Sequence, residues 1–239
     1  MTEVEFRDLS GITEFRAAEA LQVSVWGAGD TPDPADLMMV IQAEGGLVGG
    51  AFAEGRLVGY IFGFPTGTHG IQHSHRLAVL PEMRGRGLGA ELKWYQRRWC
   101  LERGIHHVRW TFDPLRSTNA RLNLRQLGAR SNTYYVDYYG EMGGINHGLP
   151  SDRLLVDWYL DDPCVKKRLA GYAEAPALGN LLRIPLSDGV QKSTNPSPPD
   201  DLECRINLRK ALLDAFACGY ELIDFVGNDY IFHKVTVAK

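Results

Sequence analysis

Three features that would indicate a membrane, secreted or nucleic-acid-binding protein are missing from the sequence. None of the apolar runs in the 239 residues approaches the roughly 20 residues that a membrane-spanning helix needs. The N-terminal residues do not form the charged-then-apolar pattern of a signal peptide. The formal net charge is −3, so the chain has no basic excess for binding nucleic acid. We therefore expect a cytoplasmic protein that binds neither a membrane nor nucleic acid.

Cysteine is scarce, and its spacing excludes two further classes of protein. The four cysteines lie far apart and form no C-x-x-C pair: Cys100, Cys164, Cys204 and Cys218. This spacing argues against a zinc ribbon or a disulfide framework and favours reduced thiols. His69, His73 and His75 lie close together, but no carboxylate or cysteine is near them in the sequence, so we predict no metal site.

Apolar periodicity predicts a mixed α/β (α+β) fold over about residues 3–140. The expected order is β-α-α-β-β-β, a glycine loop, and then α-β-α-β. The expected strands are 3–8, 47–53, 57–64, 73–80, 106–112 and 134–139, and the expected helices are 12–26, 34–44, one from Leu88 to the closing Gly104, and 119–127. One helix crosses over between the strands 73–80 and 106–112. This predicts a mixed, mostly antiparallel sheet with a parallel central pair and flanking helices.

A C-terminal extension follows this region. It contains the expected strands 153–160 and 181–186, a linker-like segment 187–200, a helix at about 201–218, and a terminal hairpin of 222–226 and 230–237. We therefore predict a first domain at 1–145 and a β/α extension at 146–239. The extension is a candidate for docking a partner or the second subunit of a homodimer.

Three glycines at alternate positions, Gly85, Gly87 and Gly89, lie between an expected strand and an expected helix. Glycine permits positive φ and close approach of a ligand, and a helix start has unpaired N–H groups and the positive end of the dipole. Together these features predict a pyrophosphate site, with a tight turn as the alternative. Nearby positive charge comes from Arg76, Arg84 and Arg86.

Two other phosphate-binding loops do not fit these residues. A Walker loop needs Gly-Lys-Ser/Thr before its helix, and that tripeptide is absent. A dinucleotide fingerprint needs two residues before its third glycine, whereas only Leu88 separates Gly87 from Gly89.

Arg84-x-x-Gly87-x-Gly89 resembles the Arg/Gln-x-x-Gly-x-Gly/Ala signature of the Gcn5-related N-acetyltransferase (GNAT) superfamily. The strand at 76–81 resembles the fourth strand of that family, and the order of elements agrees from about residue 3 to 140. The segment Thr-Phe-Asp-Pro-Leu at 111–115, with Asn119-Ala120, resembles a less-studied branch of the superfamily. The resemblance implies acetyl-CoA as cofactor and direct acetyl transfer to a primary amine of a small molecule or peptide.

The resemblance also implies which residues hold the cofactor. The backbone amides that would bind the pyrophosphate are those of Arg84, Gly85, Arg86, Gly87, Leu88, Gly89 and Ala90. The backbone that would pair with the pantetheine arm and polarise the thioester carbonyl is that of Leu77, Ala78 and Val79. Asn119 is expected either to bond the cofactor arm or to cap its own helix.

Candidate proton-transfer residues lie near this region. His73 and His75 are two apart on one strand, so both should lie on the same face, and a neutral histidine can accept the proton of an amine. The alternative is a pair of histidines held by ordinary hydrogen bonds. Asp113 is expected at the end of a strand, as a base, as an attractor for the amine, or as a turn residue before Pro114.

The resemblance places a general-acid tyrosine four residues before Gly128, but Leu124 stands there. Tyr138, expected on the same face of a strand as Tyr134, is an alternative acid. The enzyme hypothesis is supported by the histidines and Asp113. The alternative, a non-catalytic CoA-binding sensor or scaffold with a GNAT fold, is favoured by Leu124.

The helix after the glycine loop has one apolar face, formed by Leu88, Leu92, Tyr95 and Trp99, and we expect this face in the core. Lys93 is expected on one of the polar faces of the same helix.

Overall fold

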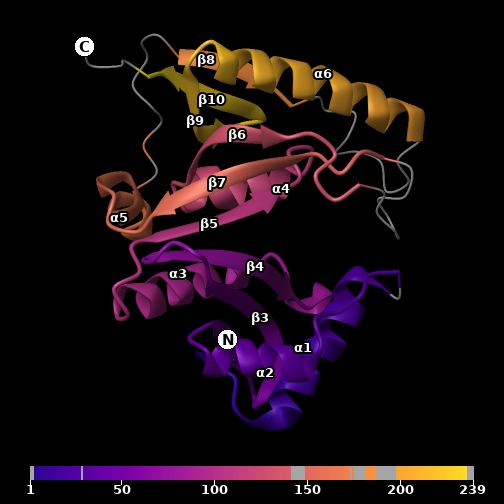
Figure 1. Cartoon of the computed structure of the whole chain (residues 1–239), viewed down its shortest axis with the longest axis vertical. Coiled ribbons are helices and arrows are strands. Elements are labelled where there is room, and N and C mark those ends of the chain that lie inside the picture. The colour runs from indigo at the N-terminus through magenta and orange to yellow at the C-terminus, as the bar shows by residue number, and fades with distance from the viewer. Residues whose placement is uncertain are drawn as a thin grey trace. The chain divides into compact units, whose positions relative to one another are not determined.

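The computed structural model describes residues 3–27, 29–140, 149–172, 174, 181–186 and 198–235. The chain divides into two compact units, Met1–Arg109 and Trp110–Lys239 (Figure 1). The predicted boundary at 145 lies outside the described residues and stays a prediction. No helix in the described part of the chain is both long enough and apolar enough to cross a membrane.

The first unit is built from five strands and three α-helices. In chain order the elements are β1 Val4–Asp8, α1 Gly11–Trp26, α2 Ala35–Ala43, β2 Leu47–Ala53, β3 Arg56–Pro65, β4 Ile71–Val79, the 3₁₀ turn η1 Pro81–Met83, α3 Leu88–Leu101 and β5 His107–Phe112, of which the first three residues belong to this unit. The strands lie in the order β1-β2-β3-β4-β5, and Figure 1 labels β3, β4 and β5. β1, β2, β3 and β4 pair antiparallel, whereas β4 and β5 pair parallel. The predicted mixed sheet with a parallel pair is confirmed.

Glycines on β2 and β3 allow α3 to lie close to this sheet. A Cβ at Gly49 would lie 2.7 Å from Cε1 of Tyr95, and a Cβ at Gly59 would lie 3.2 Å from Cδ1 of Leu92. Both partners are on α3, so side chains at these positions would push the helix away. The glycines therefore set the distance at which α3, and the loop before it, is held against the strands.

The second unit contains the remaining strands. In chain order the elements are the end of β5, α4 Ser117–Ala120 with the π-helical turn η2 Arg121–Gln126, β6 Arg130–Tyr135, β7 Arg153–Tyr159, α5 Pro163–Leu169, β8 Leu181–Pro185, α6 Pro198–Ala217, β9 Tyr220–Val226 and β10 Asp229–Lys234. The strand order is β5-β7-β6-β9-β10-β8 (Figure 1). β7 and β8 lie at the predicted strands of the extension, α6 at its predicted helix, and β9 and β10 at its predicted hairpin. β9 pairs antiparallel with β6 through Ser131↔Leu222 and so continues the sheet.

One predicted strand is misplaced. The expected strand 134–139 is β6 at Arg130–Tyr135, so Tyr138 and Tyr139 lie in the turn that follows it. The turn is fixed by Asp137, which has a positive φ of 49° and donates its backbone N–H to the buried Asp152. The tyrosine run suggested a strand because aromatic residues favour strands, but the hydrogen bonds to Asp152 end the strand earlier.

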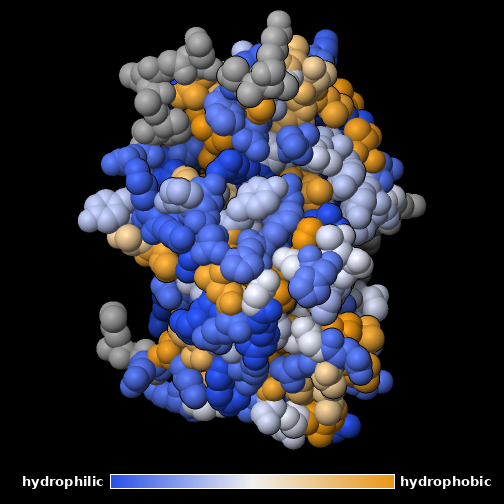
Figure 2. Space-filling view, turned by 60° about the vertical axis from the view of Figure 1, so that its left-hand side comes forward, coloured by the Kyte–Doolittle hydropathy of each residue, from blue (hydrophilic) through white to orange (hydrophobic). Residues whose placement is uncertain are grey.

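Surface side chains are of mixed polarity. On the face drawn in Figure 2, apolar side chains lie among polar ones. On α6, Leu202, Ile206 and Leu213 are exposed large apolar residues. All four cysteines have free thiols.

Candidate active site

The glycine loop has the conformation that the sequence predicts. Gly85 and Gly87 have φ of 76° and 82°, in the left-handed region, and Gly87 is the N-cap of α3. A Cβ at either glycine would meet nothing within 4 Å, because the loop from Arg84 to Gly87 is exposed. The tight turn is therefore open to a ligand.

The backbone of this loop fits an anionic group. Within the part of the chain that the structure describes, none of the N–H groups of 85–89 donates a hydrogen bond to another residue. The first N–H donors after the loop are those of Ala90 and Glu91, which bond to the carbonyl of Gly87. Unpaired amides at the positive end of a helix dipole are suited to a pyrophosphate. Arg84 and Arg86 are exposed beside them.

β4 continues past the residues that pair with β5 inside the first unit. There the parallel pairing joins Ile71–His73 to His107–Arg109, and β3 pairs with β4 as far as Val79. The register between β3 and β4 also shifts near His75, which is the extra residue of a bulge. The segment that contains Leu77, Ala78 and Val79 therefore lies past both the parallel pairing and the bulge.

The two histidines gather on one face of the sheet, as predicted. The ring of Phe64 lies 5.1 Å from that of His73 and 5.5 Å from that of His75, and the two imidazoles are 6.1 Å apart. Burial, with smaller electrostatic contributions from His75, Arg109 and Lys93, lowers the pKa of His73 to about 4. His73 is therefore neutral at pH 7. His75 is more exposed, and its Nε2 lies 3.3 Å from Oδ1 of Asp33.

A charged cluster beside His75 was not found from the sequence. Arg76 contacts Oδ2 of Asp30 at 2.5 Å and Oδ2 of Asp33 at 3.3 Å, and its guanidinium lies over the ring of Trp26. The expectation that Arg76 adds positive charge to the glycine loop is therefore not supported, because two carboxylates hold it. The signal that could have found the cluster is the pair of aspartates beside Pro32 and Pro34, in the loop between α1 and α2.

The opposite face of β4 carries a buried polar network. Lys93 of α3 is only 3% exposed, so its expected position on a polar face is wrong. Its Nζ donates to Oγ of Ser74 at 2.8 Å and to Oε1 of Gln96 at 3.2 Å. Nε2 of Gln96 donates to Oε1 of Gln72, which also accepts from Cys100. Ser74 lies between the two histidines in the sequence, so this network supports the strand that presents them.

In the second unit, Asp113 lies at the end of β5 and is bound by the C-terminal helix. Arg205 of α6 donates from Nη1 to Oδ1 at 3.1 Å and from Nη2 to Oδ2 at 3.0 Å. Oδ1 also accepts the N–H of Leu115, which is the turn contact expected before Pro114. The Arg205 side chain is 4% exposed and that of Asp113 13%, so the carboxylate is held in a largely buried ion pair.

Tyr134 and Tyr138 lie in different environments. Tyr134 is buried and donates to Oδ2 of Asp152, which also accepts from Arg209 of α6. Burial would raise the pKa of the Asp152 carboxyl, but the hydrogen bonds from Arg209, Tyr134 and the backbone of Asp137 outweigh it and lower the pKa. Tyr138 is exposed, and its ring stacks on Tyr135 at 4.6 Å. The prediction that Tyr134 and Tyr138 share a strand face is wrong, because the strand ends between them.

The helix after β5 departs from the expected helix 119–127. α4 begins at Ser117 with Arg116 at the N-cap, so the expected capping role of Asn119 is wrong. Asn119 is exposed. Leu124 lies in the π-helical turn and is 0% exposed. A side chain at position 124 therefore packs in the core, whatever its chemistry.

The structure thus groups the predicted residues as two sets. The first unit contains the glycine loop, the stretch of β4 at 77–79 and both histidines. The second unit contains Asp113, Asn119 and Tyr138.

Comparisons with known proteins agree with this geometry. Residues 15–129 match the sequence model of the acetyltransferase (GNAT) family. The ribosomal-protein-S18-alanine N-acetyltransferase from Escherichia coli is similar in structure, with a TM-score of 0.56 at 16% identity, over 67% of this chain and 96% of that chain. A GNAT phosphinothricin acetyltransferase from Sinorhizobium meliloti, in complex with AcCoA, has a TM-score of 0.53 at 19% identity, over 66% and 88%. No curated protein matches the sequence.

At 16% and 19% identity, the structural similarity shows only that the fold is shared. The family match shows that residues 15–129 form the domain with this fold. The predicted resemblance to the GNAT superfamily is confirmed by the family match. Residues 15–129 of this chain therefore match the GNAT acetyltransferase family.

Proposed function

We propose that this protein moves the acetyl group of acetyl-CoA directly to a primary amine of a small molecule or peptide, in the cytoplasm. Acetyl-CoA is the cofactor of the GNAT family, and when bound it supplies the acetyl group as a thioester. The observation that carries the proposal is the exposed glycine loop with unpaired N–H groups at 85–89. A loop of this kind, at the start of α3, suits a pyrophosphate.

The roles of the cofactor-binding residues follow from this loop. We propose that the amides of 85–89 bind the pyrophosphate and that the backbone of 77–79 pairs with the pantetheine arm. The predicted amides of Arg84 and Ala90 are not part of this set, because they donate to the carbonyls of Pro81 and Gly87. A backbone donor aimed at the thioester carbonyl contributes about 3 kcal/mol to catalysis when well placed. Asn119 is proposed to bond the cofactor arm, since it is exposed and does not cap its helix.

Of the two histidines, we propose His75 as the base. Its Nε2 faces Asp33, so Nε2 carries the proton and Nδ1 is the atom that accepts one from the amine. Asp33 then acts as a positioning residue through His75. His73 is neutral at pH 7 but a weak base, since the pKa of its ring is lowered to about 4, and we propose that it lines the same face.

Asp113 and Tyr138 are assigned different roles. Asp113 accepts two hydrogen bonds from Arg205, so we propose that it fixes α6 rather than taking a proton. Tyr138 is exposed, and we propose its hydroxyl as the acid that protonates the departing thiolate. Homodimerisation through the C-terminal extension also remains our proposal.

A matched pair of glycine variants tests the cofactor site. Gly87→Val places a β-branched side chain at φ 82° in the loop, and Gly55→Val places one at φ 74° in the β2–β3 turn, where a Cβ also meets nothing. We expect calorimetry to show CoA affinity reduced at least about tenfold by Gly87→Val, equal to about 1.4 kcal/mol, and unchanged by Gly55→Val. Unaltered CoA affinity in Gly87→Val would exclude this loop as the site.

Release of CoA thiol from acetyl-CoA with a panel of amines tests the chemistry. We expect His75→Gln to lower kcat with little change in KM, because a base acts in the transition state rather than in binding. His73→Gln is the control at the neighbouring position. CoA binding without turnover on any amine would instead support the alternative, a CoA-binding sensor or scaffold.

A further inference from the structure

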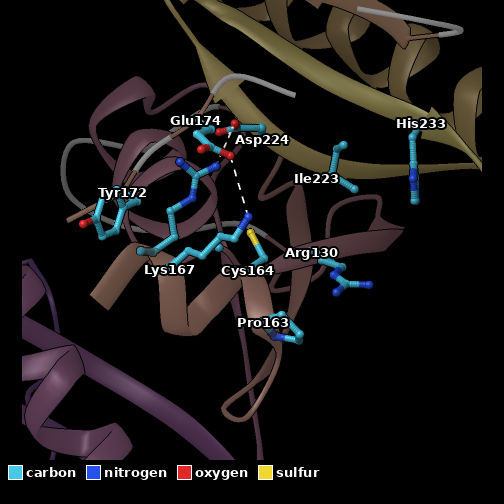
Figure 3. Close-up of a pocket in the computed structure, with 11 residues that line it drawn as sticks. Arg130, Pro163, Cys164, Lys167, Tyr172, Glu174, Ile223, Asp224 and His233 are labelled. Atoms are coloured by element: carbon cyan, nitrogen blue, oxygen red, sulfur yellow. Dashed lines mark hydrogen bonds and ion pairs between the residues drawn. The ribbon is translucent and has the colours of Figure 1, made fainter. Parts of the chain in front are cut away.

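A cavity in the second unit lies among elements that the acetyltransferase proposal does not use. It has a volume of about 420 Å³, within the range of small-molecule pockets. Its walls are α5, the segment after α5, the start of β6, and the strands β9 and β10 (Figure 3). The lining residues include Arg130, Cys164, Lys167, Arg168, Ile223 and Asp224.

Arg168, on α5, is the unusual residue of this cavity. Its side chain is 6% exposed, and Nη2 donates to Oδ2 of Asp224 at 3.0 Å. Neither Nε nor Nη1 has a hydrogen-bond partner among the described residues, although both atoms are buried. Folded proteins rarely leave such donors unmatched, because a buried donor without an acceptor loses its hydration, and the penalty is larger when the group is charged. The three unused N–H bonds of Arg168 therefore call for an acceptor.

Asp224 only partly neutralises this guanidinium. Its carboxylate is 1% exposed, and Oδ2 also accepts from Nη1 of Arg125 at 2.7 Å. The other oxygen, Oδ1, accepts the N–H of Phe225. One negative charge is thus shared between two arginines, and the cavity can accommodate one further negative charge beside Arg168.

The other basic residues of the lining already have acidic partners. Arg130 bonds to Asp162, and His233 lies 2.8 Å from Glu221. Lys167 pairs with Glu174 at 3.7 Å, as the dashed line in Figure 3 marks, but those side chains are 64% and 78% exposed. An exposed pair of this kind contributes little to stability, so both side chains can turn aside to admit a ligand.

The position of Gly128 shows that the cavity wall is built closely around Arg168. A Cβ at Gly128 would lie 3.3 Å from Cγ of Arg168 and 3.4 Å from Sγ of Cys164. Gly128 also has a φ of 71°, which disfavours other residues. The aliphatic part of Arg168 and the thiol of Cys164 therefore rest against a backbone position that has no side chain.

We infer that this cavity binds a small organic carboxylate through Arg168. A carboxylate oxygen accepts charge-assisted N–H bonds from a guanidinium, and Nε and Nη1 of Arg168 are the donors left over. A monoanion fits better than a dianion, because Asp224 and Glu174 line the same cavity and would repel a second charge. Ile223 and Pro163 provide apolar surface for a short carbon chain.

Calorimetric titration of the full chain tests this site with butyrate and benzoate as probes and butyramide as the neutral control. We expect butyrate or benzoate to bind, butyramide not to bind, and Arg168→Met to weaken carboxylate binding at least about tenfold. Lys166→Met is the matched variant, since Lys166 is on α5, 57% exposed, and does not line the cavity. It should bind the carboxylates like the unaltered chain. Absence of carboxylate binding, or equal binding by Arg168→Met, would overturn the inference.

A second measurement does not depend on whether Arg168→Met folds. Butyrate, but not butyramide, should slow alkylation of Cys164 by iodoacetamide, whereas alkylation of the exposed Cys218 should not change. Equal alkylation of Cys164 with and without butyrate would contradict the site. Inorganic sulfate, which is a dianion at neutral pH, would contradict the preference for a monoanion if it protected Cys164 as well as butyrate does.

Discussion

The buried amine of Lys93 makes a prediction about stability and pH. Burial lowers the pKa of this group from 10.5 to about 7, an effect that Cys100 partly offsets. In the unfolded chain the amine has its ordinary pKa, so folding at pH 7 or below costs about 5 kcal/mol for the charged amine, at about 1.4 kcal/mol per pKa unit. Between the two pKa values the unfolded chain binds more protons. Stability therefore rises with pH across that window, and the cost is greatest below pH 7.

Lys93→Met removes this cost while keeping a side chain of similar length. The lost hydrogen bonds offset part of the gain, by about 1–2 kcal/mol, but Oγ of Ser74 still donates to Oε1 of Gln96 at 3.2 Å. We therefore expect the free energy of unfolding to increase by about 3 kcal/mol at pH 7. The advantage of the variant should then fall by about 1.4 kcal/mol per pH unit as the pH rises towards 9.

Urea unfolding of the unaltered chain and of Lys93→Met at several pH values between 6.5 and 9 measures this difference. The contributions of other titrating groups cancel in the comparison, since they are common to both chains. A difference in unfolding free energy that is the same at every pH would refute the reasoning. It would mean that the amine keeps its ordinary pKa in the folded protein.

Three further variants test the packing of each unit, with urea unfolding as the measurement. Arg205→Met leaves the Asp113 carboxylate without its bidentate partner and should lower the free energy of unfolding by about 3–5 kcal/mol. Adding Asp113→Asn to this variant should restore part of the lost stability, and no recovery would contradict the pairing. Trp158→Phe removes the donor to the carbonyl of Leu127 at 2.9 Å and should cost about 2–4 kcal/mol. Leu92→Ala opens a cavity under α3 and should cost about 2–5 kcal/mol, so a loss below about 1 kcal/mol would show that this position is not buried.

The sequence predicts most of the elements because their signals are local. Alternating apolar residues in β5 and β7, and glycines at the ends of helices, act over a few residues and identify each element without its neighbours. The glycine loop is the strongest such case. The positive φ of Gly85 and Gly87 is a property of that short segment, so the anion site could be predicted before any packing was known.

Only the tertiary structure could decide what lies opposite each side chain. Lys93 has the spacing of a surface lysine, but it is buried because β4 places Ser74 across from it. Tyr138 follows a run of strand-forming residues, but Asp152, distant in the sequence, accepts the hydrogen bond that ends the strand. Likewise Arg168 and Asp224 are far apart along the chain, and no local pattern pairs them. Desolvation and ion pairing depend on three-dimensional neighbours, whereas backbone propensity depends on the chain itself, and this difference separates what the sequence determines from what the fold determines.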